Sequence, residues 1–152
     1  MSAKPIHATP RPHGVLVADD EPDVRDVLNE GLRRDGFLVW LAADGHEALD
    51  LYRNHWHAID VVLLDVRMPG LDGPQTLAAI QGITPQVRCC FMSGYLDNYS
   101  ETKLRELGAA TVIAKPFRLN DVTQVLGELA GRQLFPVSAA RGDTAQCSGG
   151  RS

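Results

Sequence analysis

The stretch Asp60–Gly73, which reads DVVLLDVRMPGLDG, decides the fold class of this protein. Four apolar residues, two of them β-branched, run directly into Asp65. An uninterrupted apolar run of this length is typical of a strand buried on both faces, as in a parallel sheet. Turn signals at Pro69-Gly70 and Asp72-Gly73 follow at once, so we expect Asp65 where a buried strand meets a loop. Ligands of open α/β sheets bind outside such strand ends, although a lone aspartate could also do no more than end the strand.

Outward from this strand, short apolar runs alternate with segments of helical periodicity. The predicted strands are 14–18, 37–41, 61–64, 87–92 and 110–114, and the predicted helices are about 22–35, 44–56, 74–81, 98–107 and 119–131. Five strands that alternate with five helices predict an α/β fold, a doubly wound parallel sheet with right-handed crossovers and helices on both faces.

Individual residues refine the helices. Asp44, with Glu47 three residues later, is a capping-box signature for the start of the second helix. Helical spacing predicts that Val27 and Trp56 face inward from the first and second helices, and Trp40 and Trp56 are interpreted as packing residues.

Length and charge bound the organisation of the chain, whose 152 residues suit one domain with a hydrophobic core. Residues 1–13 and 132–152 lack periodicity, and we expect them to be flexible tails around a domain at 14–131. Each tail carries +2 and the whole chain −4, which leaves −8 on the domain. So acidic a domain argues against direct binding to nucleic acid.

The cysteines and the ends of the chain indicate a compartment. Three cysteines, of which Cys89 and Cys90 lie in an apolar run, make no disulfide framework and fit a reducing environment. The first residues lack the pattern of a signal peptide, and no apolar run approaches the roughly 20 residues of a membrane span. We therefore expect a cytoplasmic protein with no membrane association.

Four of the five predicted strands end in a side chain with chemistry of its own, namely Asp19 and Asp20, Asp65, Ser93, and Lys115. A parallel sheet brings these ends to one edge, where three carboxylates would repel one another. A hard divalent cation relieves that repulsion, and Mg²⁺ suits a site of a few carboxylates, water and a phosphate oxygen. With the ammonium of Lys115 and the hydroxyl of Ser93, the set predicts phosphoryl transfer onto Asp65.

Each of these residues also has a plainer interpretation. Asp19 and Asp20 could favour the start of the first helix through its dipole, Ser93 could belong to a turn, and Lys115 could be a solvated loop residue. Their shared position at strand ends favours the site. His55 and His57 lie two positions apart, which does not place them on one helical face, so we expect no metal role for them.

The chain resembles the receiver domains of two-component response regulators over about residues 14–131. The matching motifs, in order, are Asp19-Asp20-Glu21-Pro22, Leu63-Leu64-Asp65, Met68-Pro69-Gly70-Leu71-Asp72-Gly73, Met92-Ser93-Gly94-Tyr95, Gly108-Ala109 and Lys115-Pro116-Phe117. The resemblance implies a flavodoxin-like (βα)5 fold with strand order 2-1-3-4-5.

The resemblance also implies a role for each site residue. Asp65 would accept a phosphoryl group from a histidine of a sensor kinase or of a phosphotransfer protein. Asp20, Asp65 and the backbone carbonyl of Arg67 would bind Mg²⁺ directly, and Asp19 would act through metal-bound water. Lys115 would pair with Asp65 and then with the phosphoryl oxygens, Ser93 would donate a hydrogen bond to them, and the Lys115-Pro116 bond would be cis.

The chain departs from the family pattern at one position that matters for output. Three residues before the lysine, where the family usually has Tyr or Phe, this chain has Val112. The aromatic half of the usual serine-to-ring switch is therefore missing. Gly94 stands where alanine is commoner, and Arg67 and Tyr95 hold positions that flank the phosphoryl group and tune its loss to water.

The leading hypothesis is a response regulator receiver with no attached output domain, which signals by phosphorylation-dependent docking or by relaying phosphate. Its downstream partner would bind the face formed by the fourth helix, fifth strand and fifth helix. A phosphorylation-dependent dimer is also possible. An alternative is a pseudo-receiver scaffold that never takes phosphate, but such a protein should lack a site residue. A phosphatase of the haloacid dehalogenase type would need Asp-x-Asp and a cap insertion, which this sequence lacks.

Overall fold

The computed structural model describes residues 11–94 and 98–131, which form one parallel sheet with helices on both sides. The strands are β1 (Gly14–Ala18), β2 (Leu38–Ala42), β3 (Val61–Asp65), β4 (Cys89–Ser93) and β5 (Ala109–Ala114). The helices are α1 (Pro22–Arg34), α2 (Gly45–His55), α3 (Gly73–Gln81), α4 (Glu101–Glu106) and α5 (Leu119–Leu129), with a short 3₁₀ turn at Trp56–Ala58. All neighbouring strands pair in parallel in the order β2-β1-β3-β4-β5, so the predicted flavodoxin-like α/β fold is confirmed.

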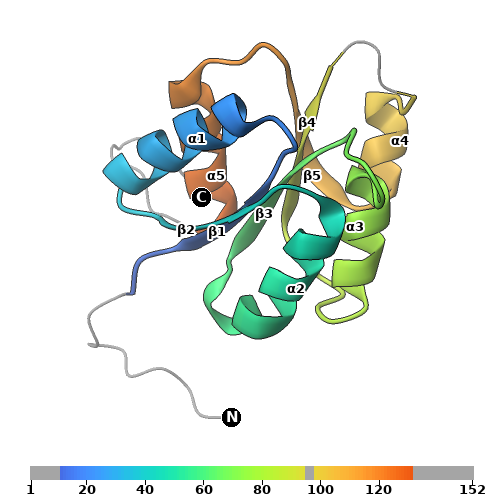
Figure 1. Ribbon diagram of the computed structural model, residues 1–152, viewed down its shortest axis with the longest axis horizontal. Helices are drawn as coiled ribbons and strands as arrows, with labels where there is room; N and C mark the ends of the chain where they lie inside the picture. The colour runs from blue at the N-terminus through green and yellow to red at the C-terminus, as the bar shows by residue number, and fades with distance from the viewer. Residues whose placement is uncertain (1–10, 95–97, 132–152) are drawn as a thin grey trace, which may run out of the picture.

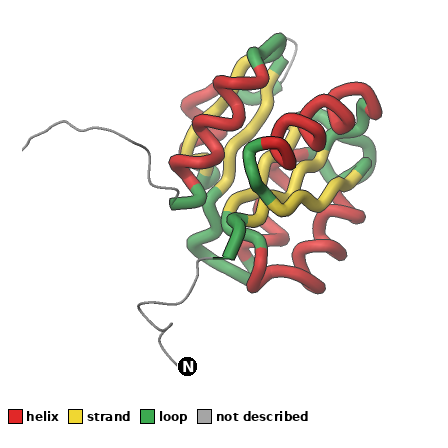
Figure 2. The backbone as a smooth tube through the Cα atoms, turned by 90° about the vertical axis from the view of Figure 1, so that its left-hand side faces the viewer, coloured by secondary structure: helices red, strands yellow, loops and turns green. Residues whose placement is uncertain are grey.

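The helices divide between the two faces of the sheet (Figure 1). Helices α1 and α5 cover one face, and α2, α3 and α4 cover the other. The turned view shows the strands between the helices (Figure 2). Two buried apolar clusters match this division: one includes Leu28, Leu32, Val122 and Leu126, the other Tyr52, Leu77 and Leu104.

The central strand is buried because both faces of the sheet are covered. Every residue of β3 is buried, and Val61 to Leu64 are fully inaccessible to solvent. Burial of one such side chain stabilises the fold by about 1.5–3 kcal/mol, which explains an uninterrupted apolar run where an open sheet would alternate. The apolar run ends at Asp65 because the carboxyl end of the strand leaves the covered part of the sheet there.

Side-chain caps set where the helices begin. Asp44 accepts a hydrogen bond from the Glu47 amide (2.8 Å), which confirms the predicted cap of α2, and Asp72 forms a reciprocal capping box with Gln75 at the start of α3. Helix α4 is shorter than the predicted 98–107, because the Ser100 hydroxyl caps the Lys103 amide and the helix begins only at Glu101.

Two predicted packing residues are exposed instead. Val27 is 50% exposed, because the inward stripe of α1 is formed by Leu28, Gly31 and Leu32 and Val27 lies at its flank. Trp56 is 52% exposed, because α2 ends at His55 and the 3₁₀ turn carries Trp56 off the helical face. The packing role predicted for Trp56 was therefore wrong.

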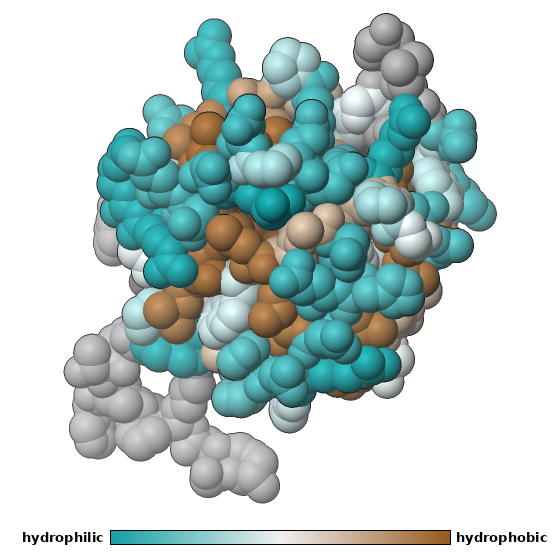
Figure 3. Space-filling view, in the orientation of Figure 1, coloured by the Kyte–Doolittle hydropathy of each residue, from teal (hydrophilic) through white to brown (hydrophobic). Residues whose placement is uncertain are grey.

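Most of the face seen in Figure 3 is hydrophilic, with apolar side chains surfacing between α1 and α2 over the edge strand β2. This agrees with an exposed Leu38 at the start of β2. In the part of the chain that the structure describes, no helix combines the length and apolar character needed to cross a bilayer.

Candidate functional site

The carboxyl ends of three strands build the site. Asp19 and Asp20 follow β1 directly, Asp65 is the last residue of β3, and Lys115 follows β5. β1 and β3 are neighbours in the sheet, so their parallel register brings the aspartates together. One carboxylate oxygen from each of Asp19, Asp20 and Asp65 lies within 4.8 Å of the others, as the alternating pattern predicted.

Lys115 is the cation that faces these acids. Its Nζ lies 3.0 Å from Asp19 Oδ2, 3.3 Å from Asp65 Oδ2 and 3.4 Å from Glu21 Oε1. The side chains of Asp19 and Asp65 are 0% and 8% exposed, so these contacts are shielded from water. The predicted pairing of Lys115 with Asp65 is present, and it is shared with two further carboxylates.

The protonation of Asp65 reflects this excess of acid. Burial, followed by the charge of Asp19, raises the pKa of Asp65 to about 6, although Lys115 and the Arg67 amide act in the opposite direction. Burial lowers the pKa of Lys115, but its hydrogen bond to Asp19 and the charge of Asp65 outweigh burial and raise it. One ammonium does not compensate the negative charge at this edge, so a further cation would be bound favourably.

Asp19 is held rigidly by the protein around it. Its Oδ1 accepts the Glu21 amide (2.9 Å), its Oδ2 accepts the Lys115 ammonium, and its backbone carbonyl accepts a guanidinium N–H of Arg25 (2.7 Å). Asp20 is exposed. The two adjacent aspartates therefore differ: Asp19 is engaged by protein donors, and Asp20 faces solvent at the rim of the site.

Ser93 and Lys115 lie on neighbouring strand ends. The Lys115 amide donates to the Ser93 carbonyl (2.9 Å), and both residues line a pocket of about 240 Å³ together with Gly94, Glu101, Val112 and Ala114. The Lys115-Pro116 peptide bond is cis, as predicted. Tyr95, for which the sequence predicted a place beside the phosphoryl group, lies outside the described residues.

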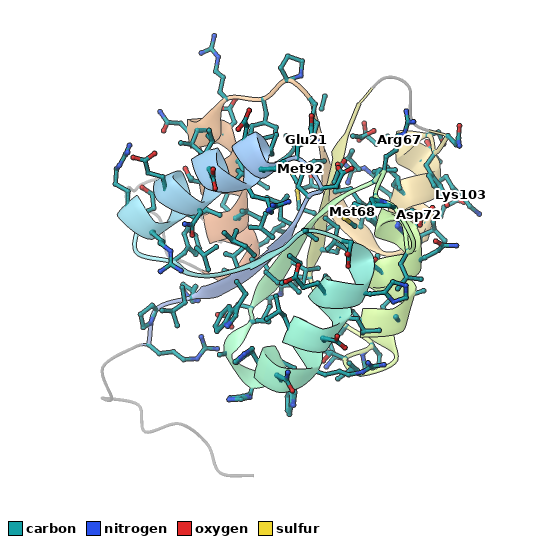
Figure 4. All side chains as sticks on the ribbon, in the orientation of Figure 1. Glu21, Arg67, Met68, Asp72, Met92 and Lys103 are labelled. Atoms are coloured by element: carbon teal, nitrogen blue, oxygen red, sulfur yellow. The ribbon has the colours of Figure 1, made fainter. Side chains whose placement is uncertain are left out.

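A second pocket, of about 440 Å³, opens beside the acids between the β3–α3 loop and the segment before α4. Its lining includes Asp20, Arg67, Met68, Asp72 and Tyr99. The Tyr99 hydroxyl donates to Asp72 Oδ2 (2.9 Å), which ties the two segments together. Figure 4 shows Arg67, Met68 and Asp72 on this side of the site.

Sequence reasoning missed three residues here. Glu21 was quoted as part of the Asp-Asp-Glu motif but given no role, although an acid directly after two site aspartates was a usable signal. Arg25 and Tyr99 carry no signal of their own, because their contacts depend on the three-dimensional arrangement. His55 stacks on Trp40 with ring centroids 5.2 Å apart, which agrees with packing at Trp40.

The residues present fit a hard cation such as Mg²⁺. The donor set consists of carboxylate oxygens, which Mg²⁺ prefers, and one of these acids is exposed at the rim. Among the described residues, no other group of three acids, histidines or cysteines comes as close together.

Comparisons with known proteins agree with this geometry. Residues 15–127 match the family described as the response regulator receiver domain. The chain is 37% identical over 110 residues to sporulation initiation phosphotransferase F of Bacillus subtilis, covering 71% of this chain and 86% of that protein. It is 36% identical to the transcriptional regulatory protein PrrA of Mycobacterium tuberculosis over 88% of this chain, but spans only 53% of PrrA.

Solved structures give the same answer. A response regulator receiver domain protein of Clostridium thermocellum aligns with a TM-score of 0.74 and 28% identity, covering 79% of this chain and 95% of that one. A CheX–CheY complex of Borrelia burgdorferi with BeF3 and Mg²⁺ aligns with a TM-score of 0.71 and 32% identity, covering 78% of this chain and 89% of that one. The chain belongs to the response regulator receiver domain family, whose members signal through phosphorylation in two-component systems.

Proposed function

We propose that this protein accepts a phosphoryl group on Asp65 from a phosphohistidine of a sensor kinase or a phosphotransfer protein, and signals by binding protein partners in the phosphorylated form. The single observation that carries this proposal is a buried carboxylate that shares one ammonium with two other acids. The Asp65 side chain is 8% exposed and lies 3.3 Å from Lys115. The relative named as a phosphotransferase supports the same reaction class.

Mg²⁺ would be held by Asp20, Asp65 and the backbone carbonyl of Arg67, with Asp19 acting through water. When bound, the ion neutralises charge on the phosphoryl oxygens during transfer. Two features support this division. Asp20 is exposed, and both carboxylate oxygens of Asp19 already accept hydrogen bonds from Glu21 and Lys115.

The transfer step itself belongs to Asp65. One of its carboxylate oxygens attacks phosphorus and forms a new O–P bond, while the N–P bond of the donor breaks and the imidazole leaves with its electron pair. Lys115 stabilises charge on the phosphoryl oxygens from its position between Asp65 and Asp19. Ser93, on the neighbouring strand end, donates a hydrogen bond to the same oxygens.

The test is labelling with acetyl phosphate and Mg²⁺, followed by intact mass. We expect wild type to gain one phosphate on part of the sample and Asp65→Asn to gain none. Asp60→Asn makes the same chemical change at the other end of β3 and should be labelled like wild type. Equal labelling of wild type and Asp65→Asn would refute the assignment.

Output is proposed to leave through α4, β5 and α5, because Ser93 lies at the end of β4 ahead of α4, and Lys115 lies between β5 and α5. With Val112 in place of a ring, Ser93 carries the coupling, and Ser93→Ala should reduce beryllofluoride-dependent amide NMR shifts over residues 98–119 more than Val112→Ala does. A full wild-type shift pattern in Ser93→Ala would exclude the serine as transmitter. The pseudo-receiver alternative is disfavoured because every expected site residue is present.

A further inference from the structure

Glu21 makes a contact that neither the helix nor the core explains. It is the N-cap residue of α1, with extended backbone angles (φ −92°, ψ 114°), but its side chain makes no capping hydrogen bond. Asp44, Asp72 and Ser100 do cap their helices with side-chain oxygens. Glutamate is not among the residues favoured at an N-cap, so hydrogen-bond capping of the helix does not account for its presence.

The side chain of Glu21 is directed instead toward Lys115. Its Oε1 lies 3.4 Å from Lys115 Nζ, while the side chain remains 62% exposed. Figure 4 places Glu21 at the same end of the sheet as Arg67. An ammonium has three hydrogens, and here three carboxylates surround it, from Asp19, Asp65 and Glu21.

We propose that Glu21 is a positioning residue that competes with the phosphoryl group on Asp65 for Lys115. This inference rests on the proposed function. Asp19 is fully buried and also accepts the Glu21 amide, so its hold on Lys115 is fixed by the fold. Glu21 is the solvent-exposed member of the three, and it draws the ammonium outward from Asp65.

A phosphoryl group on Asp65 carries more charge than the carboxylate it replaces and needs the same ammonium. When Lys115 is not held by Glu21, its ammonium is available to the phosphoryl group, which favours the phosphorylated form of Asp65. Because exposed ion pairs are weak, removing the Glu21 contact should tighten binding of an acyl-phosphate mimic by about two- to fivefold. Removing the Glu21 contact should also slow the loss of the phosphoryl group from Asp65.

The experiment titrates the full chain, saturated with Mg²⁺, with beryllofluoride and follows the amides of residues 14–20 and 112–115 by NMR. Glu21→Gln removes the charge and so weakens the contact, although the amide oxygen can still accept a hydrogen bond from Lys115. Glu21→Asp keeps the charge but shortens the side chain by one methylene. Asp23→Asn is the matched control, since Asp23 is an exposed acid in the first turn of α1.

We expect both Glu21 variants to bind beryllofluoride about two- to fivefold more tightly and Asp23→Asn to match wild type. Mg²⁺ affinity, measured in parallel, should not rise in any variant, which separates a role toward the phosphoryl group from a general change in the site. The inference is overturned if Glu21→Asp matches wild type, if Asp23→Asn equals Glu21→Gln, or if neither Glu21 variant binds more tightly. A wild-type chain that gives no Asp65-dependent response refutes the proposed function itself, and with it this inference.

Discussion

Strand β3 carries an aspartate at each end, and the two are held in opposite ways. Asp60, just before the strand, accepts hydrogen bonds from the two terminal guanidinium nitrogens of Arg11 at 2.8 and 2.9 Å and from the Gly14 amide at 2.8 Å. Asp65, at the other end, shares the single ammonium of Lys115 with Asp19 and Glu21. The same residue type therefore has matched donors at one end of the strand and surplus acids at the other.

The protonation of the two aspartates follows this balance. Burial raises the pKa of Asp60, but hydrogen bonds from Arg11 and Gly14 and the charges of Arg11 and His13 outweigh it, so the pKa is lowered. Burial and the charge of Asp19 dominate at Asp65 and raise its pKa to about 6. A partly buried carboxylate with matched donors suits a structural role, whereas a buried one without them suits the cation binding and phosphoryl transfer proposed for Asp65.

The largest expected difference between the two ends is in Mg²⁺ binding. Asp20→Ala removes a carboxylate from the acidic end and should weaken Mg²⁺ by about 10- to 100-fold, at least the range seen when groups that orient metal ligands are removed. Asp60→Ala should leave the affinity unchanged. Amide shifts of Asp65 and Arg67 during a Mg²⁺ titration measure both, and equal affinities in Asp20→Ala and wild type would contradict the proposed ligand set.

The next largest effect is a pH-dependent gain in folding stability when Asp65 is replaced by Asn. The folded-state pKa of Asp65, about 6, lies above its ordinary value of 3.8, so the folded chain holds this proton more tightly than the unfolded chain. That contribution to stability is complete below pH 3.8 and is lost as the pH rises through 6. Asp65→Asn cannot ionise, so without Mg²⁺ its advantage over wild type should grow by about 1–3 kcal/mol between roughly pH 4 and pH 7.5.

Urea unfolding at both pH values measures this change. Saturating Mg²⁺ should reduce the advantage, because the ion binds folded wild type and stabilises it. An advantage that is the same at the acidic and the alkaline pH would show that the ionisation of Asp65 costs the fold nothing.

The acidic end was the more predictable of the two from sequence. The carboxyl ends of parallel strands lie at one edge of the sheet. The alternating pattern alone therefore predicted that Asp19, Asp65 and Lys115 lie close together. The amino end gave no such signal. Arg11 lies in the segment 1–13, which sequence reasoning assigned to a flexible tail, and its contact with Asp60 spans 49 positions.

The remaining misses have physical causes, two of them local and one long-range. The start of α4 shifted from Asn98 to Glu101 because a serine hydroxyl competes for the helix start, and boundaries of this kind depend on which nearby cap wins. Trp56 was assigned inward because a helical period was continued past His55, where the backbone changes to a 3₁₀ turn. Glu21 was overlooked because its partner is 94 positions away.

A smaller effect is expected at the amino end. Asp60→Ala leaves the Gly14 amide and Arg11 without their acceptor and should destabilise the fold by about 1–2 kcal/mol at neutral pH, discounted for partial exposure. Its pKa is lowered, so the contribution is present above pH 3.8 and is lost as the pH falls through the folded value, the opposite of Asp65. Asp26→Ala, at an exposed position of α1, is the control in urea unfolding and should change stability by less than about 0.5 kcal/mol. If Asp60→Ala is equally mild, Asp60 does not anchor this end.

The smallest effect separates the two kinds of donor to Asp60. Arg11 supplies a planar fork to both oxygens but is 39% exposed, whereas the Gly14 amide begins a fully buried strand. Arg11→Lys keeps the charge and loses the two-pronged geometry, so we expect a loss of only about 0.5 kcal/mol. A double-mutant cycle of Arg11→Lys with Asp60→Asn, read by urea unfolding, should give a coupling below about 1 kcal/mol, because exposed pairs are weak and the carboxamide oxygen of the substituted side chain would still accept the Gly14 amide. A coupling as large as the whole Asp60→Ala effect would mean that Arg11, and not the Gly14 amide, makes the larger contribution. The arginine, and not the buried amide, would then be what distinguishes the amino end of β3 from its acidic end.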